Sequence, residues 1–139
     1  MINKINISKN YNDTINLGQE FSSQLEEGCI VFLQGDLGAG KTAFTKGIAK
    51  GLGIDAVVNS PTFTILKEYD GRLNLKHIDA YRLEGVDSDS LGLYDLMDKD
   101  NLVVIEWGEF LSDLDISYDY HIKFTINEDE TRTIEVLEC

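Results

Sequence analysis

Residues 30–42 read IVFLQGDLGAGKT, and this stretch decides the fold of the chain. Its first four residues form a continuous apolar run, which is typical of a strand buried on both faces of a sheet. A glycine-rich turn follows at residues 35–40. A helix is then expected over about residues 41–52, with apolar side chains along one face and Gly53 as its stop. The stretch therefore predicts a buried strand that passes through a tight turn into a helix.

The turn has the composition of a phosphate-binding loop. Residues 35–42 match the pattern G-x-x-x-x-G-K-[ST] at every fixed position. Glycines allow backbone N–H groups to surround an anion, and the N-terminus of the following helix attracts negative charge. Lys41 supplies a point charge for the outer phosphates, and the Thr42 hydroxyl is suited to ligate Mg²⁺. The predicted nucleotide-binding residues of this loop are Gly35, Asp36, Leu37, Gly38, Ala39, Gly40, Lys41 and Thr42.

A phosphate loop by itself does not choose the base. Many GTPases read guanine with an Asn/Thr-Lys-x-Asp box after a later apolar strand, and the sequence has no such box. Asp89-Ser90-Leu91-Gly92 has the D-x-x-G spacing of GTPases, but it falls in an acidic helical stretch instead of at a strand end. We therefore expect the nucleotide to be ATP.

Two acidic residues at predicted strand ends are candidates for a further Mg²⁺ ligand. Glu106 follows the apolar run at residues 102–105, and Asp79 ends a less apolar strand. A carboxylate at the end of a neighbouring strand commonly holds Mg²⁺ directly or through water. Glu106 is preferred because its strand has the buried character of a central one. The structural alternatives are a solvated strand-end carboxylate for Glu106 and a pairing with Arg82 or Lys76 for Asp79.

Three further side chains are considered as site residues, and only Thr62 has a functional interpretation beside the structural one. Thr62 lies in the segment SPTF at residues 60–63, where many P-loop proteins carry a mobile loop that reaches the γ-phosphate or the metal. The alternative for Thr62 is a proline turn that enters a strand. His77 and Trp107 are both interpreted as structural, with the Trp107 ring packed under the sheet.

The whole chain of 139 residues is predicted to form a single domain, residues 1–139. Alternating apolar residues and turn signals indicate further strands and helices on both sides of the loop. Strands are expected at about 2–7, 63–69, 73–82, 102–105, 120–126 and 132–137, and helices at 14–26, with Asp13 or Thr14 as N-cap, and 84–100. This order predicts a three-layer α/β sandwich of the P-loop NTPase type, a mixed sheet with parallel central strands and antiparallel additions.

The formal net charge of −13 is carried by the second half of the chain. Residues 84–139 contain three Lys/Arg and sixteen Asp/Glu, so this half is expected to repel RNA and DNA. It is interpreted either as a solvated face or as a docking surface for a basic partner protein.

The sequence contains no segment typical of a membrane or secreted protein. Its longest apolar run, residues 29–33, is too short to span a bilayer, and the N-terminus has no apolar core like that of a signal peptide. Cys29 and Cys139 lack the spacing of a disulfide framework or a zinc site. A soluble cytoplasmic protein is expected.

Four segments together resemble the TsaE family, formerly YjeE, the bacterial ATPases of tRNA threonylcarbamoyladenosine biosynthesis. They are GDLGAGKT at 35–42, SPTF at 60–63, HIDAYRL at 77–83 and IEWGE at 105–109, and their order and spacing match over nearly the whole chain. The resemblance implies a cytoplasmic ATPase, slow alone and stimulated by partners, that is required for N6-threonylcarbamoylation of adenosine 37 in tRNAs reading ANN codons. It implies action on the transferase subunit and its paralogous partner protein, without catalysis of the transfer. The negative charge of residues 84–139 predicts that the isolated chain does not bind tRNA tightly.

The resemblance also implies roles for particular residues. Family members hold Mg²⁺ on the residues that correspond to Thr42 and Glu106, and Asp79 corresponds to a residue implicated in hydrolysis. The segment from Tyr11 to Thr14 and Arg132 correspond loosely to further nucleotide contacts. The expected catalytic residues are Asp79 and Glu106, together with Lys41 and Thr62. The sequence departs from the family at Ala43, where little effect is expected. It also departs at Ser88 and Ser90, which concern partner contacts more than nucleotide binding.

Two other functions use the same loop. A small-molecule or nucleotide kinase needs a substrate pocket and an arginine-rich lid, and the chain has only Arg72, Arg82 and Arg132. A non-catalytic nucleotide-binding adaptor is the third interpretation. With ATP and a metabolite panel, a kinase makes a phosphorylated product and a regulatory ATPase makes only ADP and phosphate. Addition of the transferase complex separates the third interpretation.

Overall fold

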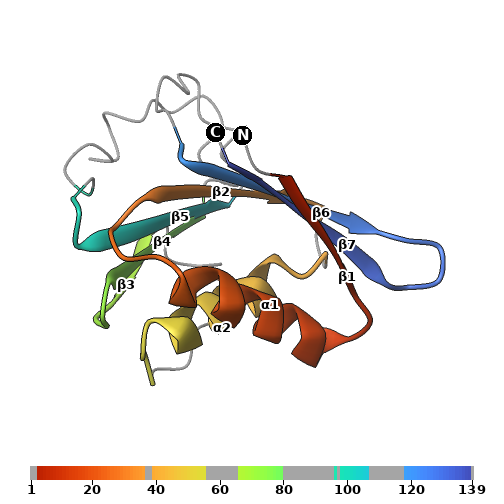
Figure 1. Ribbon diagram of the computed structural model, residues 1–139, viewed down its shortest axis with the longest axis horizontal. Coiled ribbons are helices and arrows are strands. Elements are labelled where there is room, and N and C mark those ends of the chain that lie inside the picture. The colour runs from red at the N-terminus through yellow and green to blue at the C-terminus, as the bar shows by residue number, and fades with distance from the viewer. Residues whose placement is uncertain are drawn as a thin grey trace.

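The computed structural model describes residues 3–36, 39–55, 66–79, 96, 98–106 and 118–138. Within these ranges two strands alternate with two helices, and five further strands follow (Figure 1). The strands are β1 (Asn3–Ser8), β2 (Ile30–Gly35), β3 (Leu66–Tyr69), β4 (Asn74–Asp79), β5 (Asn101–Glu106), β6 (Tyr120–Ile126) and β7 (Arg132–Glu138), and the helices are α1 (Tyr11–Ser23) and α2 (Lys41–Gly51).

The seven strands form one mixed sheet in the order β1-β7-β6-β2-β5-β4-β3. The central strands β6, β2, β5 and β4 run parallel to one another. Antiparallel pairs complete both edges, with β1 on β7 and β7 on β6 at one side and β3 on β4 at the other. The predicted mixed sheet with parallel central strands and antiparallel additions is confirmed.

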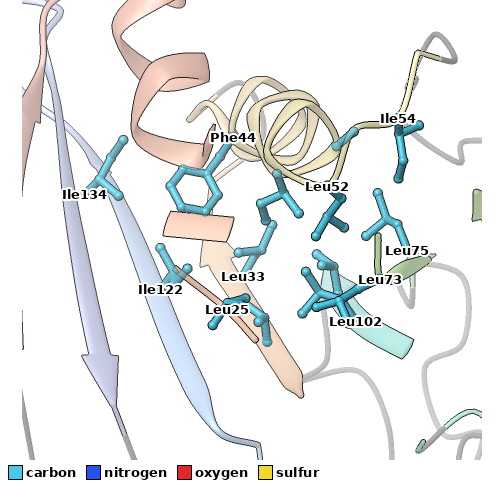
Figure 2. Close-up of a cluster of buried hydrophobic side chains, with 14 of the residues drawn as sticks. Leu25, Leu33, Phe44, Leu52, Ile54, Leu73, Leu75, Leu102, Ile122 and Ile134 are labelled. Carbon is cyan, nitrogen blue, oxygen red and sulfur yellow. The ribbon is translucent and has the colours of Figure 1, made fainter. Parts of the chain in front are cut away.

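Both helices lie against the same face of the sheet (Figure 1). Between them and the strands lies the main hydrophobic core. In it, Phe44 of α2 and Leu52, the C-cap of α2, meet side chains such as Leu33 and Leu102 of the strands (Figure 2). Phe32, which points to the opposite face of β2, is buried as well. The apolar run that opened the sequence argument is therefore buried on both faces, as predicted.

The helices approach each other closely because each places a glycine against the backbone of its partner. A Cβ atom at Gly47 would lie 1.9 Å from the carbonyl oxygen of Ile15, and one at Gly18 would lie 2.1 Å from that of Phe44. Any side chain at these positions would push the helices apart, because protein interiors have no room for it. This packing holds the N-terminus of α1 beside the N-terminus of α2, where the glycine-rich turn lies.

Helix α1 begins three residues earlier than the sequence pattern predicted. Asn10 is the N-cap, and its side-chain oxygen accepts a hydrogen bond from the Asp13 N–H at 2.9 Å. The Asp13 carboxylate accepts from the Lys9 N–H at 2.9 Å. The predicted cap at Asp13 or Thr14 is therefore wrong, because Asp13 belongs to the first turn and supports the cap from inside the helix.

The opposite end of the helix pair is held by hydrogen bonds to backbone carbonyls. Helix α2 ends at Gly51, and Gly53, the predicted stop, follows the C-cap with a φ of 76°. The Gly53 N–H donates to the Lys50 carbonyl at 3.1 Å. The Arg72 guanidinium donates to the carbonyls of Leu25 at 2.6 Å and Ser22 at 3.0 Å. Arg72 is thus used to hold the C-terminal end of α1, far from the turn before α2.

Several smaller expectations are settled by the described residues. Asp70-Gly71 connects β3 to β4, and residues 127–130 connect β6 to β7, as the turn signals predicted. Cys29 is half-buried against the core, and burial, with a smaller contribution from the Asp119 charge, raises the pKa of its thiol to about 12. Most of the expected helix at 84–100 lies outside the described residues. No helix in the described ranges is long and apolar enough to cross a membrane.

Candidate nucleotide-binding site

The glycine-rich turn lies at the carboxyl end of β2, between β5 and β6, which both run parallel to it. Gly35 ends the strand and Lys41 begins α2, so the chain reverses direction within a few residues. In the described part of the turn, the Ala39 N–H donates to the Asp36 carbonyl at 3.0 Å. The carboxyl end of a parallel sheet and the N-terminus of a helix meet here, which is the usual position of ligand sites in open α/β sheets.

The last residues of the turn create an anion-binding geometry. Gly40 has a φ of 109°, a conformation that side chains rarely adopt, so glycine is required at this place in the pattern. The first N–H groups of α2 have no partner within the helix and carry its positive dipole end. Lys41 is only 6% exposed, and its Nζ donates to the Gly35 carbonyl at 2.7 Å. Thr42 follows in the first turn of α2 and is half-buried.

Two predicted acids lie at the carboxyl ends of the parallel strands, at the end of the sheet where the turn also lies. Glu106 is the last residue of β5 and pairs in register with Leu33 of β2, two residues before the turn begins. Asp79 is the last residue of β4 and pairs in register with Glu106. The side chain of Asp79 lies outside the described residues. Lys76, one of its expected structural partners, donates to the Glu68 carboxylate at 3.1 Å.

The Glu106 carboxylate is buried and is held by a histidine. Its Oε2 lies 2.7 Å from Nε2 of His77, and the two residues are 3% and 0% exposed. His77 pairs in register with Val104, two residues before Glu106 on β5, so the side chains of His77 and Glu106 lie on the same face of the sheet. The interpretation of His77 as merely structural missed this contact. The period-2 spacing of His77 and Asp79 was the signal that could have revealed it.

A hollow of about 170 Å³ lies beside the turn and is formed by four segments of the chain. It is bordered by the end of β1, the start of α1, the start of α2 and the hairpin between β6 and β7. Its lining residues are Ser8, Asn10, Tyr11, Thr14, Gly40, Ala43, Glu130 and Arg132. Tyr11, Thr14 and Arg132, which the family resemblance suggested as nucleotide contacts, are therefore brought together next to Gly40.

Polar side chains form one wall of the hollow. The hydroxyl oxygens of Ser8 and Thr14 are 2.6 Å apart, and the Ser8 hydroxyl also donates to the Asn10 carbonyl at 2.8 Å. Ser8 and Thr14 are both buried. Sequence reasoning missed Ser8 and Asn10, although Asn10 with Asp13 three residues later is a recognisable helix-start pattern.

A lysine of α2 holds the aromatic ring at the mouth of the hollow. Lys46 Nζ donates to the Tyr11 hydroxyl at 2.8 Å and lies 5.5 Å from the centre of the Tyr11 ring. Tyr11 itself is 55% exposed, so its ring is available to a ligand. No signal in the sequence pointed to Lys46, because it is 35 residues from Tyr11.

The hairpin on the other side of the hollow is shaped by its own hydrogen bonds. The Asp129 carboxylate accepts from the Thr131 hydroxyl at 2.6 Å and from the Thr131 N–H at 3.1 Å. These bonds lower the pKa of Asp129, the hydroxyl contributing most. Glu130 has a φ of 68°, and Arg132 pairs in register with Ser8 of β1. The hairpin thereby places Arg132 on the hollow.

Three predicted site residues lie outside the described residues, namely Leu37, Gly38 and Thr62. A second and larger hollow, of about 240 Å³, lies between α1 and the outer strands. Its lining includes Leu17, Phe21 and Tyr120, but no residue of the glycine-rich turn. The hollow beside the turn is therefore the one that belongs to the candidate site.

The sheet, the turn and the helix that follows it define an α/β protein with a P-loop-like fold. The family model described as "Threonylcarbamoyl adenosine biosynthesis protein TsaE" matches residues 8–134. The chain therefore belongs to the TsaE family, as its motifs predicted, and its role lies in tRNA threonylcarbamoyladenosine biosynthesis.

Individual relatives agree with this assignment. The tRNA threonylcarbamoyladenosine biosynthesis protein TsaE of Treponema pallidum is 42% identical over 131 residues, which are 94% of this chain and 97% of that protein. The protein of the same name from Bacillus subtilis is 52% identical over 87 residues, 62% of this chain and 54% of that protein. The crystal structure of Bacillus subtilis YdiB is similar with a TM-score of 0.85 and 33% identity, covering 99% of this chain and 86% of that one.

Proposed function

We propose that this chain is an ATPase that binds Mg²⁺-ATP at residues 35–42 and serves tRNA threonylcarbamoyladenosine biosynthesis by acting on the threonylcarbamoyl transferase complex. The observation that carries the proposal is the position of the buried Lys41 ammonium. It lies at the start of α2, over a turn whose conformation requires glycine at Gly40. An ammonium at the N-terminal end of a helix, beside a glycine-rich turn, supplies positive charge where phosphate oxygens are expected to bind.

The phosphates are proposed to bind in the turn itself. Backbone N–H groups at the start of α2 donate to the phosphate oxygens, and Lys41 exchanges the Gly35 carbonyl for the outer phosphates. The ribose and base then extend into the neighbouring hollow, against Tyr11, Thr14 and Arg132. The Tyr11 ring offers a stacking surface, and the Arg132 guanidinium offers donors to ring nitrogens or to the ribose.

We assign metal binding and hydrolysis to side chains at the carboxyl ends of the parallel strands and at the start of α2. Thr42 and Glu106 have the oxygen donors that Mg²⁺ prefers, and a carboxylate buried to 3% exposure fits a cation ligand. Bound Mg²⁺ would neutralise charge on the phosphates. Asp79, one strand further on, is proposed to orient the attacking water, and Thr62 to approach the γ-phosphate.

The partner-dependent action rests on family membership and on charge. The acidic second half of the chain disfavours tRNA as a direct ligand and favours a protein partner. Arg72 is engaged by backbone carbonyls at the far end of α1, so it does not serve as the lid arginine that a kinase needs. A regulatory ATPase therefore accounts for the described residues better than a small-molecule kinase does.

The deciding experiment is ATP hydrolysis by the isolated chain, with and without the transferase subunit and its paralogous partner. Weak hydrolysis alone and clear stimulation by the pair are expected. Addition of a metabolite panel tests the kinase alternative through any phosphorylated product. Hydrolysis that the pair does not change, together with tight binding of free tRNA, would overturn the proposal.

A further inference from the structure

The contact between His77 and Glu106 is a buried polar contact between side chains of two neighbouring strands. Nε2 of His77 lies 2.7 Å from Oε2 of Glu106, and neither residue is more than 3% exposed. The two residues come from adjacent parallel strands and lie 29 positions apart in the sequence. Burial of a carboxylate is costly unless a donor satisfies it, so the contact has a reason beyond packing.

The second ring nitrogen shows which form of the histidine suits this place. Nδ1 of His77 is buried and has no hydrogen-bond partner among the described residues. A proton on Nδ1 would create a buried donor without an acceptor, which is unfavourable. Nε2, which lies 2.7 Å from the carboxylate, is therefore the ring nitrogen that donates, and Oε2 of Glu106 accepts.

We propose that His77 is a positioning residue, which holds the Glu106 carboxylate in the orientation in which it ligates Mg²⁺. This inference rests on the proposed function, because it requires Glu106 to be a metal ligand. A carboxylate at the end of a strand can rotate about its side-chain torsions, and one fixed donor removes most of that freedom. The geometry of the edge of the sheet is thereby set before nucleotide arrives.

The test compares His77→Leu, which removes the donor, with His77→Gln, which keeps an N–H within reach of Glu106. ADP affinity is measured by calorimetry at saturating Mg²⁺ and in EDTA, and the ratio of the two gives the magnesium dependence. His77→Leu is expected to lower this ratio roughly tenfold or more, as loss of a partner behind a metal ligand typically does. Affinity in EDTA should stay unchanged, and His77→Gln should restore most of the ratio.

A merely structural role predicts a different result. In thermal unfolding without nucleotide, His77→Leu should then lower the midpoint. Adding Glu106→Gln to the His77→Leu chain should recover part of that loss, because an unpaired amide is cheaper to bury than an unpaired carboxylate. A lowered midpoint with an unchanged magnesium ratio would overturn the positioning role. Should the leucine variant not fold, His77→Asn takes its place, because its shorter amide falls short of Glu106.

Glu106→Gln in the otherwise unchanged chain separates this inference from the proposed function. If it lowers the magnesium ratio while His77→Leu does not, only the positioning role is wrong. If Glu106→Gln leaves the ratio unchanged, the assignment of Glu106 to the metal is wrong, and the positioning role is overturned with it.

Discussion

The glycine-rich turn and the hollow beside it are neighbours that are built in opposite ways. The turn is one continuous stretch, residues 35–42, and it offers backbone N–H groups with a single buried charge at Lys41. The hollow is assembled from four separate segments, and it offers a ring, hydroxyl groups and a guanidinium. Phosphates are alike in every nucleotide, whereas the base differs.

The comparison teaches how the two tasks are divided. A backbone site tolerates changes of most side chains, because its donors are common to all residues. A site made of side chains depends on the packing that brings them together, here the close contact of α1 and α2 at Gly18 and Gly47. Variants in the turn should therefore affect every phosphate ligand, and variants in the hollow only ligands that carry a base.

Lys41→Ala tests the turn with the largest expected effect. Loss of a charge-assisted hydrogen bond of this kind costs about 1.5–3 kcal/mol, which corresponds to about a 10- to 150-fold loss of affinity. Calorimetric titration with Mg²⁺-ADP and with tripolyphosphate should show the loss for both. Lys50→Ala, at an exposed position near the other end of α2, is the control and should bind as the wild type does. A loss for ADP alone would contradict the division.

Gly40→Ala is expected to have the next largest effect, on stability and on binding together. A side chain at a φ of 109° is strained, and such backbone strain costs of the order of 1–3 kcal/mol. The free energy of unfolding from urea titration and the affinity for tripolyphosphate should both fall. Gly40→Asn is the matched variant and should lose less stability, because Asn tolerates positive φ better than Ala does.

Tyr11→Leu and Arg132→Met test the hollow. Each removes one proposed contact to the base or ribose, worth about 1 kcal/mol, so ADP affinity should fall several-fold. Binding of tripolyphosphate should not change, since it does not reach the hollow. Equal losses for both ligands would show that the hollow and the turn act as one site.

Lys46→Met is expected to have the smallest effect and refines the comparison within the hollow. Lys46 contacts both the hydroxyl and the ring of Tyr11, and an exposed contact of this type contributes about 0.5–1 kcal/mol. ADP affinity should fall about two- to fivefold. In a chain that already carries Tyr11→Leu, the same change should have no further effect. An additive loss would mean that Lys46 contacts the nucleotide directly.

The sequence by itself determined the β2–turn–α2 unit and most of the strands. The apolar run at residues 30–33, the glycine pattern and the helical spacing after Lys41 are all local signals, readable within about a dozen residues. The hairpin turns at Asp70-Gly71 and at residues 127–130 are local in the same sense. The start of α1 was misplaced because Asp13 resembles a cap, whereas the side chain of Asn10 satisfies the first turn.

Tertiary structure alone decided which distant residues share a surface. Strand order placed β6 and β5 on either side of β2, and the parallel register of β4 with β5 brought His77 to Glu106. The close contact of the two helices set Tyr11 against Lys46 and Thr14 beside Gly40. The physical reason is that turns and side-chain periods depend on a few adjacent residues, whereas strand adjacency and helix packing depend on how the whole core fills its space.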